Sequence, residues 1–336
     1  MRLIRGFVNP PAVARGAVVA IGNFDGVHKG HQALVTVAAE AAKKVDAPLG
    51  VVTFEPHPRK LFQKDELPFR LTPLRGKLRL LDALGVDIAI VLRFDDAFAG
   101  TSADTFAEDI LGRSFGVRHA VVGYDFAFGH RRQGNPQLLE RAGRQHGYRV
   151  TVVDPQSDGR EIFASGRVRD FLVQGRLAEA TNELGRFWEV DGYVQHGAGR
   201  GASIGFPTAN IHLEEIIRPA LGVYAVRAGL RRDDGVISWH DGVANLGRRP
   251  TFGGEDVILE VHLFDFDRDL YRQRLRVAFI DYLRPELKFD GLEALTSQIS
   301  SDCEHARSLL HGKRGQPGWF ERDNLPPAIN TSDDRG

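Results

Sequence analysis

The chain has 336 residues, and its 44 Lys and Arg are balanced by 44 Asp and Glu, so its formal net charge is zero. Apolar residues make up 42% and charged residues 26%, which excludes the disordered, collagen-like and fibrous classes. A neutral chain without a basic stripe argues against a nucleic-acid partner. Because the length exceeds what one hydrophobic core usually serves, we expect two domains.

The cysteine content and the lengths of the apolar runs indicate the cellular compartment of the protein. Cys303 is the single cysteine of the sequence, which excludes an internal disulfide and favours a reducing environment. The start of the sequence has no signal-peptide pattern, and no stretch approaches the roughly 20 apolar residues of a membrane helix. We therefore expect a cytoplasmic protein without membrane contact. Residues 313–336 mix Lys, Gly, Pro and Asp without periodicity and predict a flexible tail.

The first half alternates short β-branched runs with helical patterns. The predicted strands are Val18–Ile21, Val51–Phe54, Ile88–Leu92, Ala120–Val122 and Val150–Val153. The predicted helices are His31–Val45, Thr72–Leu84, Ala103–Leu111 and Pro136–His146. Continuous apolar strands that alternate with helices predict an α/β domain with a doubly wound, Rossmann-like parallel sheet. Since ligands bind beyond the carboxyl ends of such strands, we expect a site in the loop after the first one.

The pattern changes after Gly185. Alternating strands at Val223–Arg227, Ile258–Leu263 and Leu275–Ile280, separated by Gly, Pro and Asp turns, predict a small antiparallel β-barrel. A helical pattern over Leu292–Leu310 predicts a C-terminal helix packed against the barrel. The predicted domains are residues 1–185 and 186–312, followed by the tail.

The first chemical signal is the string GNFDGVHKGH at residues 22–31. Its glycines let the backbone approach a phosphate chain, the following helix N-terminus supplies N–H donors, and His28 and His31 can face the same oxygens. Two other interpretations stay open from the residues alone. One is a tight turn with hydrogen-bonded histidines; the other is a metal site of His28, His31 and His57, disfavoured because no carboxylate or thiolate set completes it.

The second signal is a loop with four glycines in nine positions, at Gly197, Gly199, Gly201 and Gly205. Such a loop can wrap phosphates through its backbone. Thr208 and Asn210 follow it and point to one side if the chain is extended there, and their oxygens suit Mg²⁺. A plain barrel turn is the alternative.

The first string, which follows a strand and ends with HxGH at residues 28–31, resembles the nucleotidyltransferase superfamily. In full it is similar to the adenylyltransferase domain of the bacterial bifunctional riboflavin kinase/FAD synthetases, as are TFEPHP at residues 53–58 and GYDFAFG at 123–129. The resemblance implies that ATP phosphates are held by His28 and His31 with Gly22, Phe24, Asp25, Gly26 and His57. It also implies that Asp125, Phe126 and Phe128 shape a flavin site. From spacing alone, the two phenylalanines could equally form a strand's core face.

The chain departs from this family at one motif. The family carries Ser-Ser-Thr before x-Ile-Arg, whereas this sequence has Ala164-Ser165-Gly166 before Arg167-Val168-Arg169. The resemblance assigns Ser165 to phosphate binding and Arg169 to charge stabilisation, while the two missing hydroxyls are the basis for the alternative of an impaired adenylyltransferase. The alternative is that Arg167 and Arg169 are solvated residues of an ordinary helix.

The string GFPTAN at residues 205–210 resembles the riboflavin kinase signature, and its companions follow at 222–224, 242–252 and 259–266. The resemblance implies that Glu260 is the general base, that Gly199, Gly201 and Gly205 bind phosphate, and that Thr208 and Asn210 hold Mg²⁺. The alternative for Glu260 is an exposed strand residue between core Leu259 and Val261. A glycine commonly follows the tyrosine at position 271, where this chain has Arg272, and we expect only a changed turn.

The resemblance implies a bifunctional enzyme that phosphorylates riboflavin to FMN and adenylylates FMN to FAD, with ATP as co-substrate and Mg²⁺ in both steps. Two alternatives are weighed against it. One is an active kinase with an impaired adenylyltransferase; the other is a flavin-binding regulator without turnover. The sequence leaves the oligomeric state open.

Overall fold

A computed structural model describes residues 1–63, 68–197, 200–213, 215–232, 234–251 and 254–312. The described residues fall into two compact units. The first takes its residues from Met1–Glu66 and Leu74–Ala164, and the second from Leu67–Pro73 and the chain from Ser165 onward. The predicted tail, 313–336, lies outside the described residues. The predicted domain boundary at residue 185 stays a prediction, although the chain between 165 and 185 makes its contacts with the second unit.

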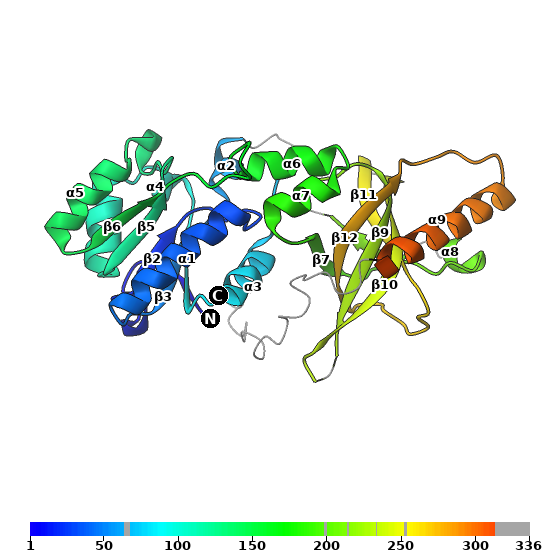
Figure 1. Cartoon of the computed structure of the whole chain (residues 1–336), viewed down its shortest axis with the longest axis horizontal. Coiled ribbons are helices and arrows are strands. Elements are labelled where there is room, and N and C mark those ends of the chain that lie inside the picture. The colour runs from blue at the N-terminus through cyan, green and yellow to red at the C-terminus, as the bar shows by residue number, and fades with distance from the viewer. Residues whose placement is uncertain (64–67, 198–199, 214, 233, 252–253, 313–336) are drawn as a thin grey trace. The chain divides into compact units, whose positions relative to one another are not determined.

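The first unit is built on a parallel sheet with strand order β1-β4-β3-β2-β5-β6 (Figure 1). Five of its strands contain the predicted runs, and the doubly wound parallel sheet is confirmed. The remaining strand, β1, pairs with β4 at the sheet edge and was not predicted. The strands are β1 Arg2–Arg5, β2 Val18–Ile21, β3 Leu49–Glu55, β4 Ile88–Arg93, β5 His119–Gly123 and β6 Arg149–Val153.

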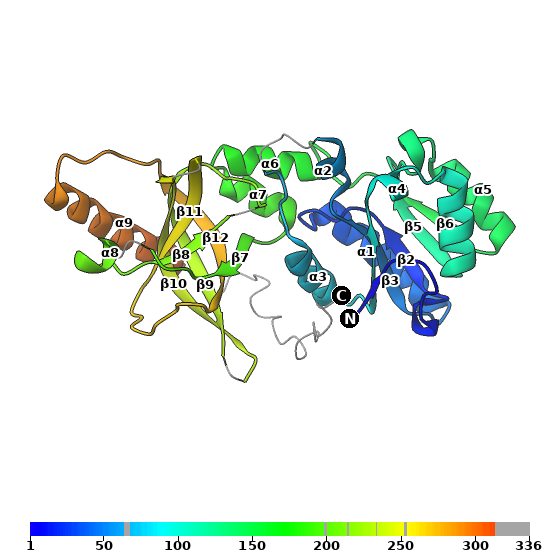
Figure 2. The ribbon, with the colours of Figure 1, turned by 180° about the vertical axis from the view of Figure 1, so that it is seen from behind.

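Helices cover both faces of this sheet (Figure 2). Alternate residues of β4 show this, because Ile90 packs in the cluster that holds Phe106 and Leu139, whereas Ala89 and Val91 pack with Leu78. The helices are α1 Lys29–Lys44, α2 Pro58–Phe62, α3 Leu74–Ala83, α4 Asp96–Ala99, the π-helix η2 Thr105–Ser114 and α5 Pro136–His146, with 3₁₀ turns η1 Ala12–Ala14 and η3 His130–Arg132.

Local sequence sets the ends of α5. The Asn135 side chain accepts a hydrogen bond from the Leu138 N–H at its start, and Gly147 ends it in the left-handed conformation at φ 78°. These are the preferred residues for the two caps. The predicted and observed bounds therefore agree.

The second unit is an antiparallel half-barrel with strand order β7-β12-β9-β10-β11-β8. An isolated bridge between Gln195 and Asn210, with a backbone hydrogen bond of 2.9 Å, links the two ends of this order. The predicted small antiparallel barrel is thus confirmed. The strands are β7 Trp188–Tyr193, β8 Ala209–His212, β9 Gly222–Arg231, β10 Ile237–Thr251, β11 Gly254–Leu263 and β12 Arg274–Arg284.

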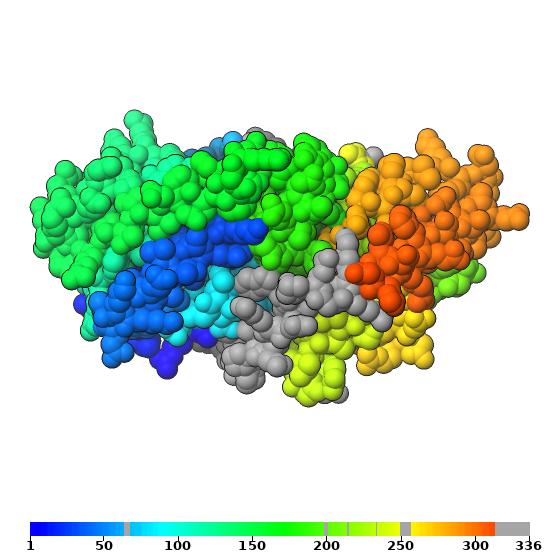
Figure 3. Space-filling model, in the orientation of Figure 1, coloured from blue at the N-terminus to red at the C-terminus, as the bar shows by residue number. Residues whose placement is uncertain are grey.

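The two faces of this sheet are covered differently. One face encloses a core that includes Tyr224, Leu259 and Phe279. On the other, helix α9 (Leu292–Gly312) buries Ala306 and Leu310 in one apolar cluster with sheet residues. The predicted C-terminal helix therefore packs against the barrel, and its outer side lies on the surface in orange and red in Figure 3.

The remaining helices of the second unit are α6 Ser165–Val173, α7 Leu177–Leu184 and the single turn α8 Arg200–Ser203. A separate segment, residues 68–73, also belongs to this unit. Its Leu71 is fully buried in the barrel core, and the Trp188 Nε1–H donates to the Leu71 carbonyl at 3.0 Å. Within the described residues, no helix combines the length and apolar character needed to span a membrane.

Candidate functional sites

The loop after β2 lies at the point where the strand order of the first sheet reverses. Because β3 and β5 flank β2, the loops after these three strands meet at the same sheet edge. Ligands of doubly wound sheets bind at this position. Phe24, Gly26 and Val27 adopt positive φ angles of 50°, 82° and 45°. Left-handed backbone at two residues with side chains is costly and is typical of functional loops.

The paired histidines end this loop. His28 is the N-cap residue of α1 and His31 lies in its first turn, with ring centroids 3.7 Å apart. The Phe24 ring lies 5.1 Å from that of His31. A Cβ on Gly30 would lie 3.1 Å from the His28 ring, so the glycine leaves room for this imidazole. The first turn of α1 has no acidic residue, which keeps its N-terminus favourable for an anion.

The loop after β3 supplies His57. Its side chain caps α2, since Nδ1 accepts a hydrogen bond from the Arg59 N–H at 3.1 Å, and 9% of the residue is exposed. His57 thus has a local structural role at the sheet edge where the loop of residues 22–28 lies. Among the described residues, no group of three or more His, Cys, Asp and Glu is placed to hold a metal ion.

The predicted flavin residues follow β5. Phe128 is buried in the core of the first unit, with its ring 5.3 Å from that of Phe106. The half-buried Phe126 stacks on it at 5.1 Å and 20°, and Asp125 is exposed. Phe128 therefore serves the core. Asp125 and Phe126 retain surface that a ligand could contact.

Ser165 and Arg169 lie on α6 and are grouped with the second unit. The Arg169 Nε–H donates to the Phe69 carbonyl at 2.8 Å, and its guanidinium lies over the Phe69 ring. Arg167 forms a 3.0 Å ion pair with buried Glu183. Neither arginine is an ordinary solvated residue of a helix. Because a guanidinium carries five donors, the Phe69 contact is compatible with a phosphate role for Arg169.

The barrel places Glu260 between two amides. In the strand register Glu260 of β11 faces Asn210 of β8 on one side and Asn245 of β10 on the other. Their side chains share the face that α9 covers, because Leu259 and Val261 point into the opposite core. Glu260 does alternate with core residues, but the register also gives it polar neighbours. Asn245 was not singled out from the sequence, since only the strand pairing reveals it.

The glycine-rich loop packs directly onto this group. A Cβ on Gly197 would overlap the Asn210 amide, and a Cβ on Gly201 would overlap the Phe206 carbonyl. The Asn210 Nδ2–H donates to the Thr208 carbonyl at 3.3 Å. Gly205 has φ 89°, a conformation that favours glycine. Gly199 lies outside the described residues.

A histidine on β11 anchors the end of the loop. The His262 Nδ1 lies 2.9 Å from the Pro207 carbonyl, and the Phe206 ring is 5.6 Å from the imidazole. His262 shares the face of Glu260, two residues away. The GFPTAN segment is therefore fixed against the strand that carries the carboxylate.

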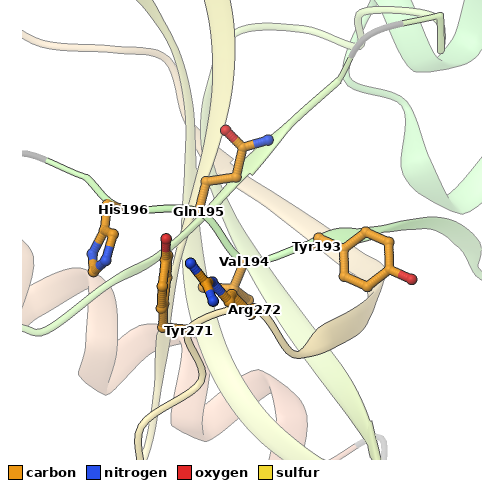
Figure 4. A pocket seen from close by; sticks show the side chains of 6 residues that line it. All are labelled: Tyr193, Val194, Gln195, His196, Tyr271 and Arg272. Atoms are coloured by element: carbon orange, nitrogen blue, oxygen red, sulfur yellow. The ribbon is translucent and has the colours of Figure 1, made fainter.

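An open pocket of about 530 Å³ adjoins the start of the glycine-rich loop. It is lined by Tyr193, Val194, Gln195, His196, Tyr271 and Arg272. Figure 4 shows the His196 and Tyr271 rings face to face, with centroids 3.5 Å apart, and Arg272 on the other side of Tyr271. Arg272 has φ 61°, so the position where the family commonly has glycine carries a strained turn. Sequence reasoning missed this pocket, because its two sides are distant in the chain.

Two family models divide the chain between them. The model described as FAD synthetase matches residues 11–167, and the model described as riboflavin kinase matches residues 184–310. These ranges cover the loop at residues 22–28 of the first unit and the Glu260 group of the second.

Similar proteins cover nearly the whole chain. The bifunctional riboflavin kinase/FMN adenylyltransferase of Haemophilus influenzae is 40% identical over 93% of this chain and 100% of its own length. The protein of the same name from Escherichia coli K12 is 42% identical over 92% of this chain and 98% of its own. A crystal structure from Streptococcus pneumoniae, described as a macrolide-efflux protein, covers 91% of this chain and 99% of its own, with a TM-score of 0.81 and 30% identity. This chain belongs to the family of bifunctional riboflavin kinase/FMN adenylyltransferases.

Proposed function

We propose that the second unit transfers the ATP γ-phosphoryl group to the riboflavin 5′-hydroxyl, with Glu260 as general base. The single observation that carries this proposal is the register that sets Glu260 against Asn210. A carboxylate within reach of the hydroxyl accepts its proton as the O–P bond forms. Positioning and charge neutralisation then supply most of the acceleration.

Thr208 and Asn210 would hold the Mg²⁺ of this step. Their hydroxyl and amide oxygens are hard donors of the kind that Mg²⁺ prefers. The close approach of Gly197 and the bond to the Thr208 carbonyl fix the Asn210 amide, so the site is rigid on one side. When bound, the ion would neutralise charge on the ATP phosphates. Because Asn210 faces Glu260 across the strands, the ion would be held beside this carboxylate.

The pocket beside the glycine-rich loop would accept the base of ATP. The outer face of the exposed His196 ring offers a flat surface for stacking, since Tyr271 stacks on its inner face, and the chain passes directly from His196 into Gly197. A base stacked there leaves its phosphates at the backbone N–H groups of the loop.

The first unit would then join FMN to the AMP part of ATP. An FMN phosphate oxygen attacks the α-phosphorus and pyrophosphate leaves, so no protein base is needed. His28 and His31 stabilise charge on the triphosphate together with the N-terminus of α1. Asp125 and Phe126 contact the flavin. The expected cytoplasmic location, supported by the lone cysteine, is part of this proposal.

Paired variants test the two-site assignment. Purified protein is incubated with riboflavin, or with FMN, in the presence of ATP and Mg²⁺, and the flavins are separated by chromatography. Glu260→Gln is expected to stop FMN formation while FAD formation from supplied FMN persists, and His28→Asn is expected to do the reverse. The exposed Glu293→Gln on α9 serves as the matched control. Loss of both activities in either variant would contradict two separate sites.

The same assay separates the two other hypotheses. A kinase impaired in adenylylation, as the Ala164–Gly166 departure would cause, forms FMN but little FAD. A flavin-binding regulator forms neither product.

A further inference from the structure

Helix α3 of the first unit contains a buried lysine. Lys77 is only 1% exposed and is among the largest fully buried side chains of the described residues. Burying an ammonium group is costly unless it is hydrogen-bonded. Its Nζ donates to the Thr53 hydroxyl at 3.3 Å, so the charge is directed at β3. Packing alone does not account for such a residue, because an apolar side chain would fill the same space at lower cost.

Thr53 links Lys77 to the loop at residues 22–28, which is called the phosphate loop below. The residue is fully buried near the carboxyl end of β3, and its hydroxyl donates to the Asn23 carbonyl at 3.2 Å. A hydroxyl that accepts from an ammonium becomes a stronger donor, so the two bonds reinforce one another. Lys77, Thr53 and Asn23 thus form a hydrogen-bonded relay from α3 to the loop.

The loop requires an anchor at this point. The Gly22 N–H donates to the Val52 carbonyl at 3.1 Å, which continues the sheet pairing up to that residue. The backbone then leaves the sheet, and Phe24 takes up a positive φ of 50°. Strained conformations persist only where surrounding contacts hold them. The Asn23 carbonyl, held by Thr53, lies directly between the last paired residue and the first strained one.

We propose that Lys77 is a positioning residue for FMN adenylylation: acting through Thr53, it holds the phosphate loop in the conformation that binds the ATP triphosphate. Lys77 itself contacts no substrate in this proposal. The inference rests on the proposed role of the loop at residues 22–28. It predicts that breaking the relay weakens ATP binding in the first unit and leaves phosphorylation of riboflavin in the second unchanged.

The test compares Lys77→Met, Thr53→Val and the double variant. Each is expected to raise the KM for ATP in FAD formation roughly tenfold, with a smaller change in kcat, because a hydrogen bond to a charged group is lost. The double variant should be no worse than the poorer single one, since both interrupt the same relay. Thr53→Ser keeps the hydroxyl and should restore a nearly normal KM.

Two controls separate positioning from general destabilisation. Leu81→Ala opens the core one helical turn from Lys77 on the same helix α3 and removes neither hydrogen bond of the relay, and Leu81 is fully buried. It should lower the melting temperature and leave the KM for ATP unchanged at temperatures well below melting. Riboflavin phosphorylation, measured in the same preparations, reports whether the second unit is intact. If Lys77→Met does not fold, Thr53→Val and Thr53→Ser carry the test.

Three outcomes overturn the relay. These are an unchanged KM in Thr53→Val, an equal rise in Leu81→Ala, or additive effects in the double variant. If the proposed ATP site at residues 22–28 were itself wrong, the result would differ, because His28→Asn would then keep full adenylylation activity. A His28→Asn variant that loses adenylylation, beside a Thr53→Val variant with a normal KM, defeats the relay alone.

Discussion

Glu260 and Asn210 are direct cross-strand partners on β11 and β8. Side chains at such positions lie about 5 Å apart at their Cβ atoms, so strand pairing rather than loop conformation sets the spacing of the two groups. A register shift of one residue would turn Glu260 into the barrel core. The hydrophobic pattern that fixes the register therefore also sets the spacing between the proposed general base and the proposed Mg²⁺ ligand.

The contact of Gly197 with the Asn210 amide allows a sharp mutational test. In Gly197→Ala the new methyl group would overlap that amide, so the loop or Asn210 must move. A displacement of about 1 Å in a group that positions substrate typically costs on the order of a hundredfold in rate. We expect such a loss in FMN formation and normal FAD formation from FMN. Gly291→Ala, where a Cβ meets nothing within 4 Å, is the matched control and should retain both activities.

Arg272→Gly should change stability and nucleotide binding in opposite ways. Removing the side chain at φ 61° relieves left-handed strain, and the expected gain in unfolding free energy is up to about 1 kcal/mol. The guanidinium that lies 5.1 Å from the Tyr271 ring is lost, so the KM for ATP in the kinase reaction should rise several-fold. Chemical denaturation and kinase assays measure the two effects. Arg268→Gly, without a positive φ, should show no stability gain.

The Cys303 thiol is expected to react slowly in the folded protein. Burial, with the nearby Asp302 carboxylate, raises the pKa of Cys303 to about 11. Since the thiolate is the reactive form, alkylation at pH 8 should be at least about a hundredfold slower than in denaturant. Mass spectrometry of iodoacetamide-treated protein follows the reaction. Rapid native labelling would show that α9 does not hold Cys303 against the sheet as described.

His119 should make the stability of the first unit sensitive to acid. Burial, and secondarily Arg149, lower the pKa of His119 below 6.5, so the folded state favours the neutral imidazole. Its contribution to stability is complete above pH 6.5 and is lost as the pH falls through the lowered pKa. The melting temperature should therefore drop between pH 7.5 and pH 5, and less so in His119→Gln. The exposed His305→Gln should keep the wild-type pH dependence.

The sequence predicted the frame of both units for a clear physical reason. Strands buried on both faces, such as Val18–Ile21, read as continuous apolar runs, and α5 carries explicit caps at Asn135 and Gly147. Strand β1 was not predicted, because its two apolar residues lie between Arg2 and Arg5 at a sheet edge. An edge strand of this length resembles any short surface segment.

The sequence predicted which segments form the sites, but not how their side chains are arranged in space. The glycines and histidines of the two loops were recognised, whereas the placement of Asn245 beside Glu260 depends on pairing between strands. Lys77 could not be found, because a lysine in an amphipathic helix is expected to face solvent. The strain at Arg272 needed a backbone angle, which no residue pattern specifies.

The burial of Leu71 bears on how the kinase half could be produced alone. This residue belongs to the second unit, although the chain of the first unit continues on both sides of it. A gene fragment that starts at residue 165 would leave Leu71 behind and deprive the Trp188 indole of its acceptor. Such a fragment would have a cavity in its core where Leu71 packs. A peptide spanning residues 68–73, supplied in trans, has the residues that would fill this cavity.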